Sequence, residues 1–135
     1  MFVKKTQIPI RLSDVDLAGH VHNSKYLDYF EAGRMAYMAD FVPADHDWKA
    51  LGLILARNVL DYLAPVRLND DASINVWCSA VGRKSFTLEY EMHVTRDSTE
   101  VPVCREKSVM VCFDYHAQQT IAIPDGWRQE LENRQ

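Results

Sequence analysis

The chain has 135 residues, of which 47% are hydrophobic and 25% charged, and its formal net charge is −4. This length predicts one domain spanning residues 1–135, with the composition of a globular chain rather than a disordered one. No run of basic residues exceeds two and no apolar stretch approaches a membrane span, so we expect neither nucleic acid nor membrane as a partner.

The first half of the chain predicts a strand followed by a long helix. Residues 3–12 are typical of a strand, and residues 13–23 form a polar segment. From Ser24 to about Val42 the pattern is helical, because long or apolar side chains recur at three- and four-residue steps: Leu27, Phe30, Arg34, Met38 and Phe41. Asn23 or Ser24 is a suitable N-cap, and Pro43 marks the end of the helix. Further apolar residues widen this surface, so we expect a buried helix.

The rest of the chain predicts four strands, at residues 53–63, 74–80, 86–94 and 101–115. In the last strand, alternation places six residues on one face: Val101, Val103, Val109, Val111, Phe113 and Tyr115. Residues 69–71 and 82–84 are expected to be turns, and strands joined by short turns pair antiparallel. The sequence therefore predicts an α+β fold in which an antiparallel sheet of about five strands wraps around the helix.

The three cysteines predict the compartment. They lack a CxxC spacing and lie in apolar strand-like runs: Cys78, Cys104 and Cys112. An odd number without a compact framework favours buried, reduced thiols and a cytoplasmic location.

Residues 14–26 carry the candidate chemistry. If residues 14–16 are extended, the carboxylates of Asp14 and Asp16 project to the same side, and two close like charges raise one pKa. The start of the helix offers unpaired N–H groups and the positive end of the helix dipole. Aimed at a carbonyl oxygen, these groups form an oxyanion hole. A carboxylate beside such a hole is the minimum equipment for hydrolysing an activated acyl group.

Two other interpretations of this segment stay open. Asp14 and Gly19 suit a plain turn, and Asn23 suits a plain helix cap, with no catalysis. His20 and His22 offer a metal pair with the aspartates, but no further His or Cys lies at a ligand spacing, so we expect no metal. A nucleophile elbow and a glycine-rich phosphate loop are absent from the sequence.

The segment Asp14-Val15-Asp16-Leu17-Ala18-Gly19-His20-Val21-His22-Asn23, followed by Tyr26, Phe30-Glu31 and Arg34, resembles the signature of the 4-hydroxybenzoyl-CoA thioesterase-like family, which has the hotdog fold. The likeness continues through residues 60–66, 69–70 and 82–86. The order of strands and helix also agrees with the hotdog order.

The resemblance implies the following roles. Asp16 is the catalytic carboxylate, and the backbone N–H of Asn23 or its neighbour is the oxyanion donor. Substrate-binding positions are His20, His22 and Tyr26, although His22 replaces an asparagine common in relatives and Val15 replaces a threonine. Arg83, Lys84 and Ser85 are implied to bind the phosphates of coenzyme A; by composition alone they are equally well an exposed basic turn. Members of the family pair their sheets, so we expect a homo-oligomer, either a dimer or a dimer of dimers (a homotetramer), with the site at the subunit boundary.

The leading hypothesis is therefore hydrolysis of an acyl-CoA thioester, with Asp16 as nucleophile or general base. Coenzyme A enters as part of the substrate, and no other cofactor is expected. The alternatives are a non-catalytic acyl-CoA or acyl-carrier binding module and a hotdog hydratase or dehydratase. The sequence leaves the acyl group, the leaving thiol and the pathway open.

Overall fold

The computed structural model describes residues 1–135 and contains one antiparallel sheet and two α-helices. The elements, in chain order, are β1 (Lys4–Ile8), a 3-10 turn (Leu12–Asp14), α1 (Lys25–Ala39), β2 (Gly52–Tyr62), β3 (Asp71–Val81), β4 (Ser85–Arg96), β5 (Thr99–Asp114), β6 (Gln119–Thr120) and α2 (Asp125–Asn133). The predicted helix and the five longer strands are confirmed. Their ends differ from the expected ones by up to four residues.

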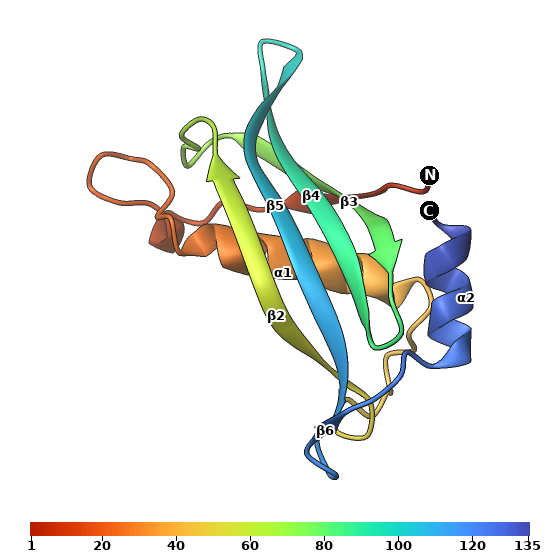
Figure 1. Cartoon of the computed structure of the whole chain (residues 1–135). Helices are drawn as coiled ribbons and strands as arrows, with labels where there is room; N and C mark the ends of the chain where they lie inside the picture. Colours follow the sequence, from red (N-terminus) through yellow and green to blue (C-terminus); the bar gives the residue numbers. More distant parts are fainter.

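The sheet has the strand order β1-β3-β4-β5-β2, with the short β6 pairing with β5. All pairings are antiparallel. Strand β2 leaves its sequence neighbour β3 and pairs with β5, so that β2 is one edge of the sheet and has a free side. Figure 1 shows α1 crossing behind the sheet, with β2 at one side and the loop before α1 projecting at the N-terminal end of that helix.

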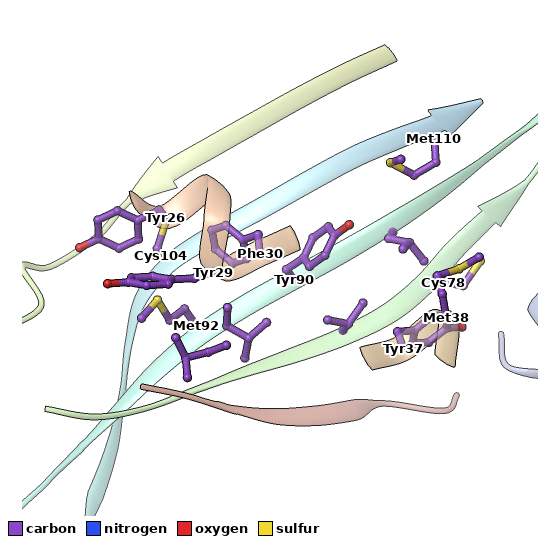
Figure 2. Packing of buried hydrophobic residues seen from close by; sticks show 14 of the residues in the cluster. Tyr26, Tyr29, Phe30, Tyr37, Met38, Cys78, Tyr90, Met92, Cys104 and Met110 are labelled. Atoms are coloured by element: carbon purple, nitrogen blue, oxygen red, sulfur yellow. The ribbon is translucent and has the colours of Figure 1, made fainter. Parts of the chain in front are cut away.

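The core lies between α1 and the sheet (Figure 2). Phe30, Tyr37 and Met38 of α1 are fully buried against inward-facing strand residues such as Tyr90 and Met92. Close packing of such large side chains is the main source of stability for a chain of this size. The prediction of a buried helix is therefore correct for most of α1.

One face of α1 is exposed, contrary to the expected apolar stripe. Leu27 was predicted to be buried with Phe30, but its exposed fraction is 46%, and that of Met35 is 40%. Both residues line a cavity that also contains residues of β2. The sheet of a single chain thus leaves the side of the helix next to β2 uncovered.

A bulge in β5 overturns the predicted face of that strand. Pairing with β4 shifts between Met92 and His93, which oppose Cys104 and Pro102, so Val103 is an extra residue. After the bulge the buried positions are even-numbered: Cys104, Glu106, Ser108, Met110 and Cys112. Because side-chain direction alternates, one inserted residue exchanges the two faces of the strand. The expectation that Val101 to Tyr115 keep one set of odd-numbered residues on one face was therefore wrong.

The C-terminal segment adds a helix that the sequence analysis did not predict. Helix α2 buries only Trp127 and Leu131, and it lies beside the end of the sheet next to both termini (Figure 1). The N–H of Phe2 donates to the carbonyl of Arg134 at 2.8 Å, which ties the two ends of the chain together. All three cysteines are free and buried, as expected. Neither helix has the length and hydrophobicity needed to cross a membrane.

Candidate active site

The loop between β1 and α1 is folded back on itself. Val15 and Val21 form an isolated antiparallel bridge, and the N–H of Gly19 donates to the carbonyl of Asp16 at 3.0 Å. Gly19 has a φ of 79°, a left-handed conformation that costs glycine little and most other residues more. The loop therefore turns at Gly19 and presents Asp16 near its tip.

Asp14 anchors the base of this loop. Its carboxylate has no exposed surface and accepts hydrogen bonds from the hydroxyl of Tyr29 at 2.7 Å and from the N–H of Arg11 at 3.1 Å. Burial raises the pKa of Asp14, but the hydrogen bonds from Tyr29 and Arg11 lower it more, so the net pKa is below the ordinary value. Its backbone carbonyl also accepts from the N–H of His22 at 2.9 Å. Asp14 thus holds the loop against the first turns of α1.

Asp16 is on the exposed side of the loop, away from Asp14. Its Oδ1 accepts from the N–H groups of Ala18 at 2.9 Å and His20 at 3.1 Å. The hydrogen bond from His20 is the main reason that the pKa of Asp16 is lowered. The expectation that the two close carboxylates raise the pKa of one of them was wrong, because the Asp14 carboxylate is buried and hydrogen-bonded and the Asp16 carboxylate faces outward. Both of these hydrogen bonds to Asp16 use Oδ1, which leaves Oδ2 for chemistry.

The start of α1 provides N–H donors beside this loop. Ser24 is the N-cap residue and its side chain makes no capping hydrogen bond. The backbone N–H groups of Asn23 and Ser24 donate to no acceptor in the chain. Such groups carry the positive end of the helix dipole and suit an anionic oxygen. The predicted location of an oxyanion donor at Asn23 therefore coincides with unpaired N–H groups.

The loop, the helix start and the end of β2 enclose a concavity of about 340 Å³. Four of the residues proposed from the sequence line it: Asp16, His20, Asn23 and Tyr26. Tyr26 is buried, and this burial raises its pKa to about 12. His22 does not line this concavity; its side chain is exposed and borders an open hollow on the other side of the loop, which Asp16 also lines.

Tyr62 is a site residue that the sequence analysis did not assign. It ends β2, lines the concavity and donates a hydrogen bond from its hydroxyl to the carbonyl of Asn23 at 3.3 Å. Its ring also contacts that of Tyr26 edge-on, with centroids 5.2 Å apart. The sequence signals were its position near the end of a strand and its place in the family-like segment 60–66, and neither by itself assigns a role to the side chain.

The basic turn at Arg83, Lys84 and Ser85 lies far from Asp16 within one chain. Ser85 pairs with Val111 at one end of the sheet, whereas Tyr62 pairs with Cys104, the partner of Met92, near the other end. Ser85 and Met92 are seven positions apart on β4, which is about 23 Å along a strand. The turn is held by Arg128 of α2, which donates to the carbonyl of Gly82 at 2.7 Å. One chain therefore does not bring the implied phosphate-binding turn to the concavity.

The aspartates and histidines of the loop do not form a metal-binding cluster. No three His, Cys, Asp or Glu side chains lie close enough together to hold a metal ion. The carboxylate of Asp14 is hydrogen-bonded to Tyr29 and Arg11, and Oδ1 of Asp16 is hydrogen-bonded to backbone N–H groups.

Comparison with known proteins gives a consistent result. The sequence model of the Thioesterase-like superfamily matches residues 10–131 of this chain. The chain is 25% identical to the long-chain acyl-CoA thioesterase FadM of Escherichia coli (strain K12), over 95% of this chain and 96% of that protein. A predicted thioesterase from Bacillus stearothermophilus is 26% identical, with a TM-score of 0.86 over 98% of this chain and 96% of that one.

A mutant 4-hydroxybenzoyl-CoA thioesterase in complex with 4-hydroxybenzoyl-CoA superposes with a TM-score of 0.87 at 16% identity, over 97% of this chain and 99% of that one. At this identity the likeness concerns the fold, and it confirms the predicted hotdog arrangement of sheet and helix.

Proposed function

Because the chain belongs to the Thioesterase-like superfamily, we propose that it hydrolyses acyl-CoA thioesters to a free acid and coenzyme A. The main observation behind this proposal is that Asp16 and Asn23, at the start of the helix, line the same concavity. A carboxylate and unpaired helix N–H groups on one wall are suited to attack on a carbonyl carbon and to binding of its oxygen. The similarity to the acyl-CoA thioesterase FadM supports the choice of substrate class.

The proposed reaction begins when the thioester carbonyl oxygen accepts a hydrogen bond from the N–H of Asn23. Oδ2 of Asp16 attacks the carbonyl carbon, the C–S bond breaks, and coenzyme A leaves as a thiolate that takes a proton from solvent. Water then cleaves the resulting mixed anhydride and regenerates the carboxylate. The lowered pKa of Asp16 makes it a weak base, so we favour this direct attack over general-base activation of water.

Thiol release from a panel of CoA esters tests the proposed activity. A thiol-reactive dye detects free coenzyme A when short, long and aromatic esters are incubated with the protein. Hydrolysis of at least one ester is expected. Saturable binding of the esters without thiol release would instead identify a binding module, and a change in the absorbance of an enoyl thioester would identify a hydratase.

We also propose that the active form is a homo-oligomer in which strands β2 of two chains pair. The free edge of β2 has unpaired backbone groups, and exposed apolar side chains flank it: Leu27, Met35, Leu55 and Val59. Such an edge and such a surface favour association. Antiparallel pairing about a two-fold axis brings the Gly52 end of one β2 beside the Tyr62 end of the other. The Arg83 turn of one subunit then approaches the Asp16 concavity of its partner.

Mixing two defective variants tests this shared site. Asp16→Asn removes the carboxylate, and Arg83→Ala removes a proposed phosphate contact. A hybrid dimer has one intact site if the two residues come from different subunits, so mixing is expected to restore turnover with the KM of the unmodified protein. Mixtures that show only the sum of the two separate activities would contradict a shared site. Light scattering after size exclusion gives the number of subunits, a dimer or a dimer of dimers.

The proposed hydrolysis needs no cofactor, since coenzyme A is part of the substrate and Asp16 with the Asn23 N–H supplies the chemistry. The three free, buried cysteines support a reducing compartment such as the cytoplasm as its location.

A further inference from the structure

A second cavity lies along α1, beyond the concavity of Asp16. Its volume is about 490 Å³, and it lies between the exposed face of the helix and strands β2 and β5. Leu27 and Met35 of α1 and Leu55 of β2 form part of an apolar wall, together with Met110 of β5. This size and lining are typical of sites that bind small organic molecules.

Two polar side chains on the wall of this cavity lack hydrogen-bond donors. Glu106 has an exposed fraction of 4%, and its Oε2 has no partner. Oδ1 of Asn58, on the neighbouring strand β2, is likewise buried and without a partner. Unpaired buried polar atoms are rare because each costs about 1–3 kcal/mol. Their common position on a cavity wall points to a ligand that supplies the missing hydrogen bonds.

Burial raises the pKa of Glu106, and a hydrogen bond from the Asn58 side chain lowers it in part, but Oε2 of Glu106 and Oδ1 of Asn58 stay unpaired. The other nearby donors have partners of their own. The guanidinium of Arg34 donates to the hydroxyl of Tyr90 at 3.5 Å and lies 3.9 Å from a carboxylate oxygen of Glu31. The hydroxyls of Tyr90 and Ser108 bond to each other at 2.8 Å. Arg34, Tyr90 and Ser108 are thus joined by hydrogen bonds, and Asn58 and Glu106 are the strand-register partners of Ser108 and Tyr90. These five residues form a polar cluster with two unpaired acceptors.

The cavity and the concavity of Asp16 lie along the same helix, with Tyr26 on the wall of the concavity and Leu27 on the wall of the cavity. Asn23, Leu27 and Glu31 follow one another at four-residue steps, so they lie along one stripe of the helix. From Asn23 to Glu31 the helix rises about 12 Å. An acyl chain whose carbonyl is bound at Asn23 and that follows this stripe passes Leu27 and reaches the level of the polar cluster, since Leu27, Glu31 and Arg34 all line the cavity.

The charged side chains around the cavity determine which chemical group at the end of the acyl chain binds there. Asp28, Glu31 and Glu106 face the cavity with one cation, Arg34, so an anionic end is repelled. Burial raises the pKa of Glu106 to about 7, which leaves it partly protonated at neutral pH. A hydroxyl has one hydrogen to donate and can also accept, so it donates to Oδ1 of Asn58 and accepts from Glu106 when that carboxyl group is protonated. An ammonium only donates, so it cannot accept a hydrogen bond from protonated Glu106. It is also repelled by the guanidinium of Arg34, which lines the same cavity.

We propose that this cavity binds the far end of a medium-length acyl chain, and that Asn58 and Glu106 recognise a hydroxyl group at that end. The inference rests on the proposed hydrolysis for the position of the carbonyl. It names ω-hydroxyacyl groups of about ten carbons as the preferred substrate class, because their length matches the rise of about 12 Å from Asn23 to Glu31.

Binding of non-hydrolysable thioethers tests the inference separately from the activity. Calorimetry compares S-(ω-hydroxydecyl)-CoA with S-decyl-CoA, and the two corresponding hexyl compounds serve as length controls. The hydroxydecyl compound is expected to bind about tenfold more tightly than the decyl compound, as one added hydrogen bond to a buried acceptor implies. The hexyl pair is expected to show no difference, because its hydroxyl stops short of Glu106.

Glu106→Met removes the carboxylate and is expected to abolish the tenfold preference. Asn58→Leu removes the second acceptor and replaces this test if Glu106→Met does not fold. Lys107→Met is the matched control, because Lys107 is the exposed neighbour of Glu106 on the opposite face of β5; it is expected to keep the preference. Equal affinities for the decyl and hydroxydecyl compounds, an unchanged preference in Glu106→Met, or tighter binding of an ω-amino compound would overturn the inference. Failure of thiol release from decanoyl-CoA would instead refute the hydrolysis and leave the binding result standing.

Discussion

The substitution Tyr29→Phe tests whether the Asp14 anchor stabilises the loop that carries Asp16. The hydroxyl of Tyr29 donates to the buried carboxylate of Asp14 at 2.7 Å, the shortest of its hydrogen bonds. Hydrogen bonds to a charged group contribute about 1.5–3 kcal/mol, and the carboxylate cannot turn to solvent when the donor is removed. We expect a loss of about 2 kcal/mol in the free energy of unfolding. For a chain of this length the melting temperature then falls by roughly 6–10 °C.

The pH dependence of this loss identifies its cause. The pKa of Asp14 is lowered in the folded chain, so its contribution is complete above the ordinary aspartate pKa of about 3.9. That contribution is lost as the pH falls through the lowered value. The difference between Tyr29→Phe and the unmodified protein is therefore expected to be full at neutral pH and to narrow below about pH 4.

Urea unfolding from neutral to acidic pH measures this difference. Tyr115→Phe is the matched control, because the hydroxyl of Tyr115 makes no hydrogen bond in the chain and the residue is 41% exposed; it is expected to leave stability unchanged. A melting temperature of Tyr29→Phe equal to that of the control, or a loss that stays constant down to pH 3, would refute the proposed anchor.

Three further predictions concern the core, the basic turn and the reaction. Burial raises the pKa of Glu106 to about 7, so the unmodified protein is expected to lose up to about 3 kcal/mol of stability as the pH rises from about 4 to about 7. Glu106→Gln has no such ionisation and is expected to become the more stable protein over this range; a stability difference in urea unfolding that does not depend on pH would contradict this. Arg83→Ala is expected to raise KM for a CoA ester about tenfold at low salt with little change in kcat, since Arg83 lies in an exposed turn and a charged phosphate contact is lost; salt-independent kinetics would argue against it. If water cleaves the mixed anhydride at the Asp16 carbonyl, a single turnover in heavy-oxygen water is expected to place label in the carboxylate of Asp16, detected by peptide mass; an unlabelled carboxylate would contradict cleavage at that carbonyl.

The fold was predictable because its main elements have distinct periodicities. Residues 86–94 alternate cleanly, and the strand there is observed as β4, Ser85–Arg96. Helix α1 combines Phe30, Arg34 and Met38 at helical spacing, and all three are buried. Helix α2 escaped prediction because it is short and presents only Trp127 and Leu131 to the core. A single pair of residues four apart is too weak a pattern to indicate a helix.

The bulge in β5 explains why the polar cluster was not predicted. Strict alternation from Val101 places Glu106 on the opposite face to Val103 and Val109, as an ordinary solvent-facing glutamate. The extra residue at Val103 exchanges the faces and turns Glu106 into the core. Insertion of one residue into a strand leaves no distinct mark in composition or pattern. The structure was therefore needed to find this group.

The candidate site was only partly visible in the sequence. The motif around Asp16 and Asn23 placed a carboxylate near a helix start, and the structure brings both to one concavity. Local spacing also predicted that Asp14 and Asp16 act on each other, which failed because the 3-10 turn at Leu12–Asp14 directs Asp14 into the interior. The contact of Tyr62 with Asn23 depends on strand order, which spacing along the chain does not give.

The turnover of Asp16→Asn tests the central claim most directly. The amide keeps the shape of the side chain and can still accept from Ala18 and His20, so the fold is expected to stay intact, but it cannot attack or deprotonate. We expect kcat for the best CoA ester to fall by at least about 10³-fold, with an unchanged melting temperature. Asp45→Asn, at an exposed aspartate outside the concavity, is expected to retain full turnover. Near-normal turnover by folded Asp16→Asn would remove Asp16 from the mechanism and contradict the account.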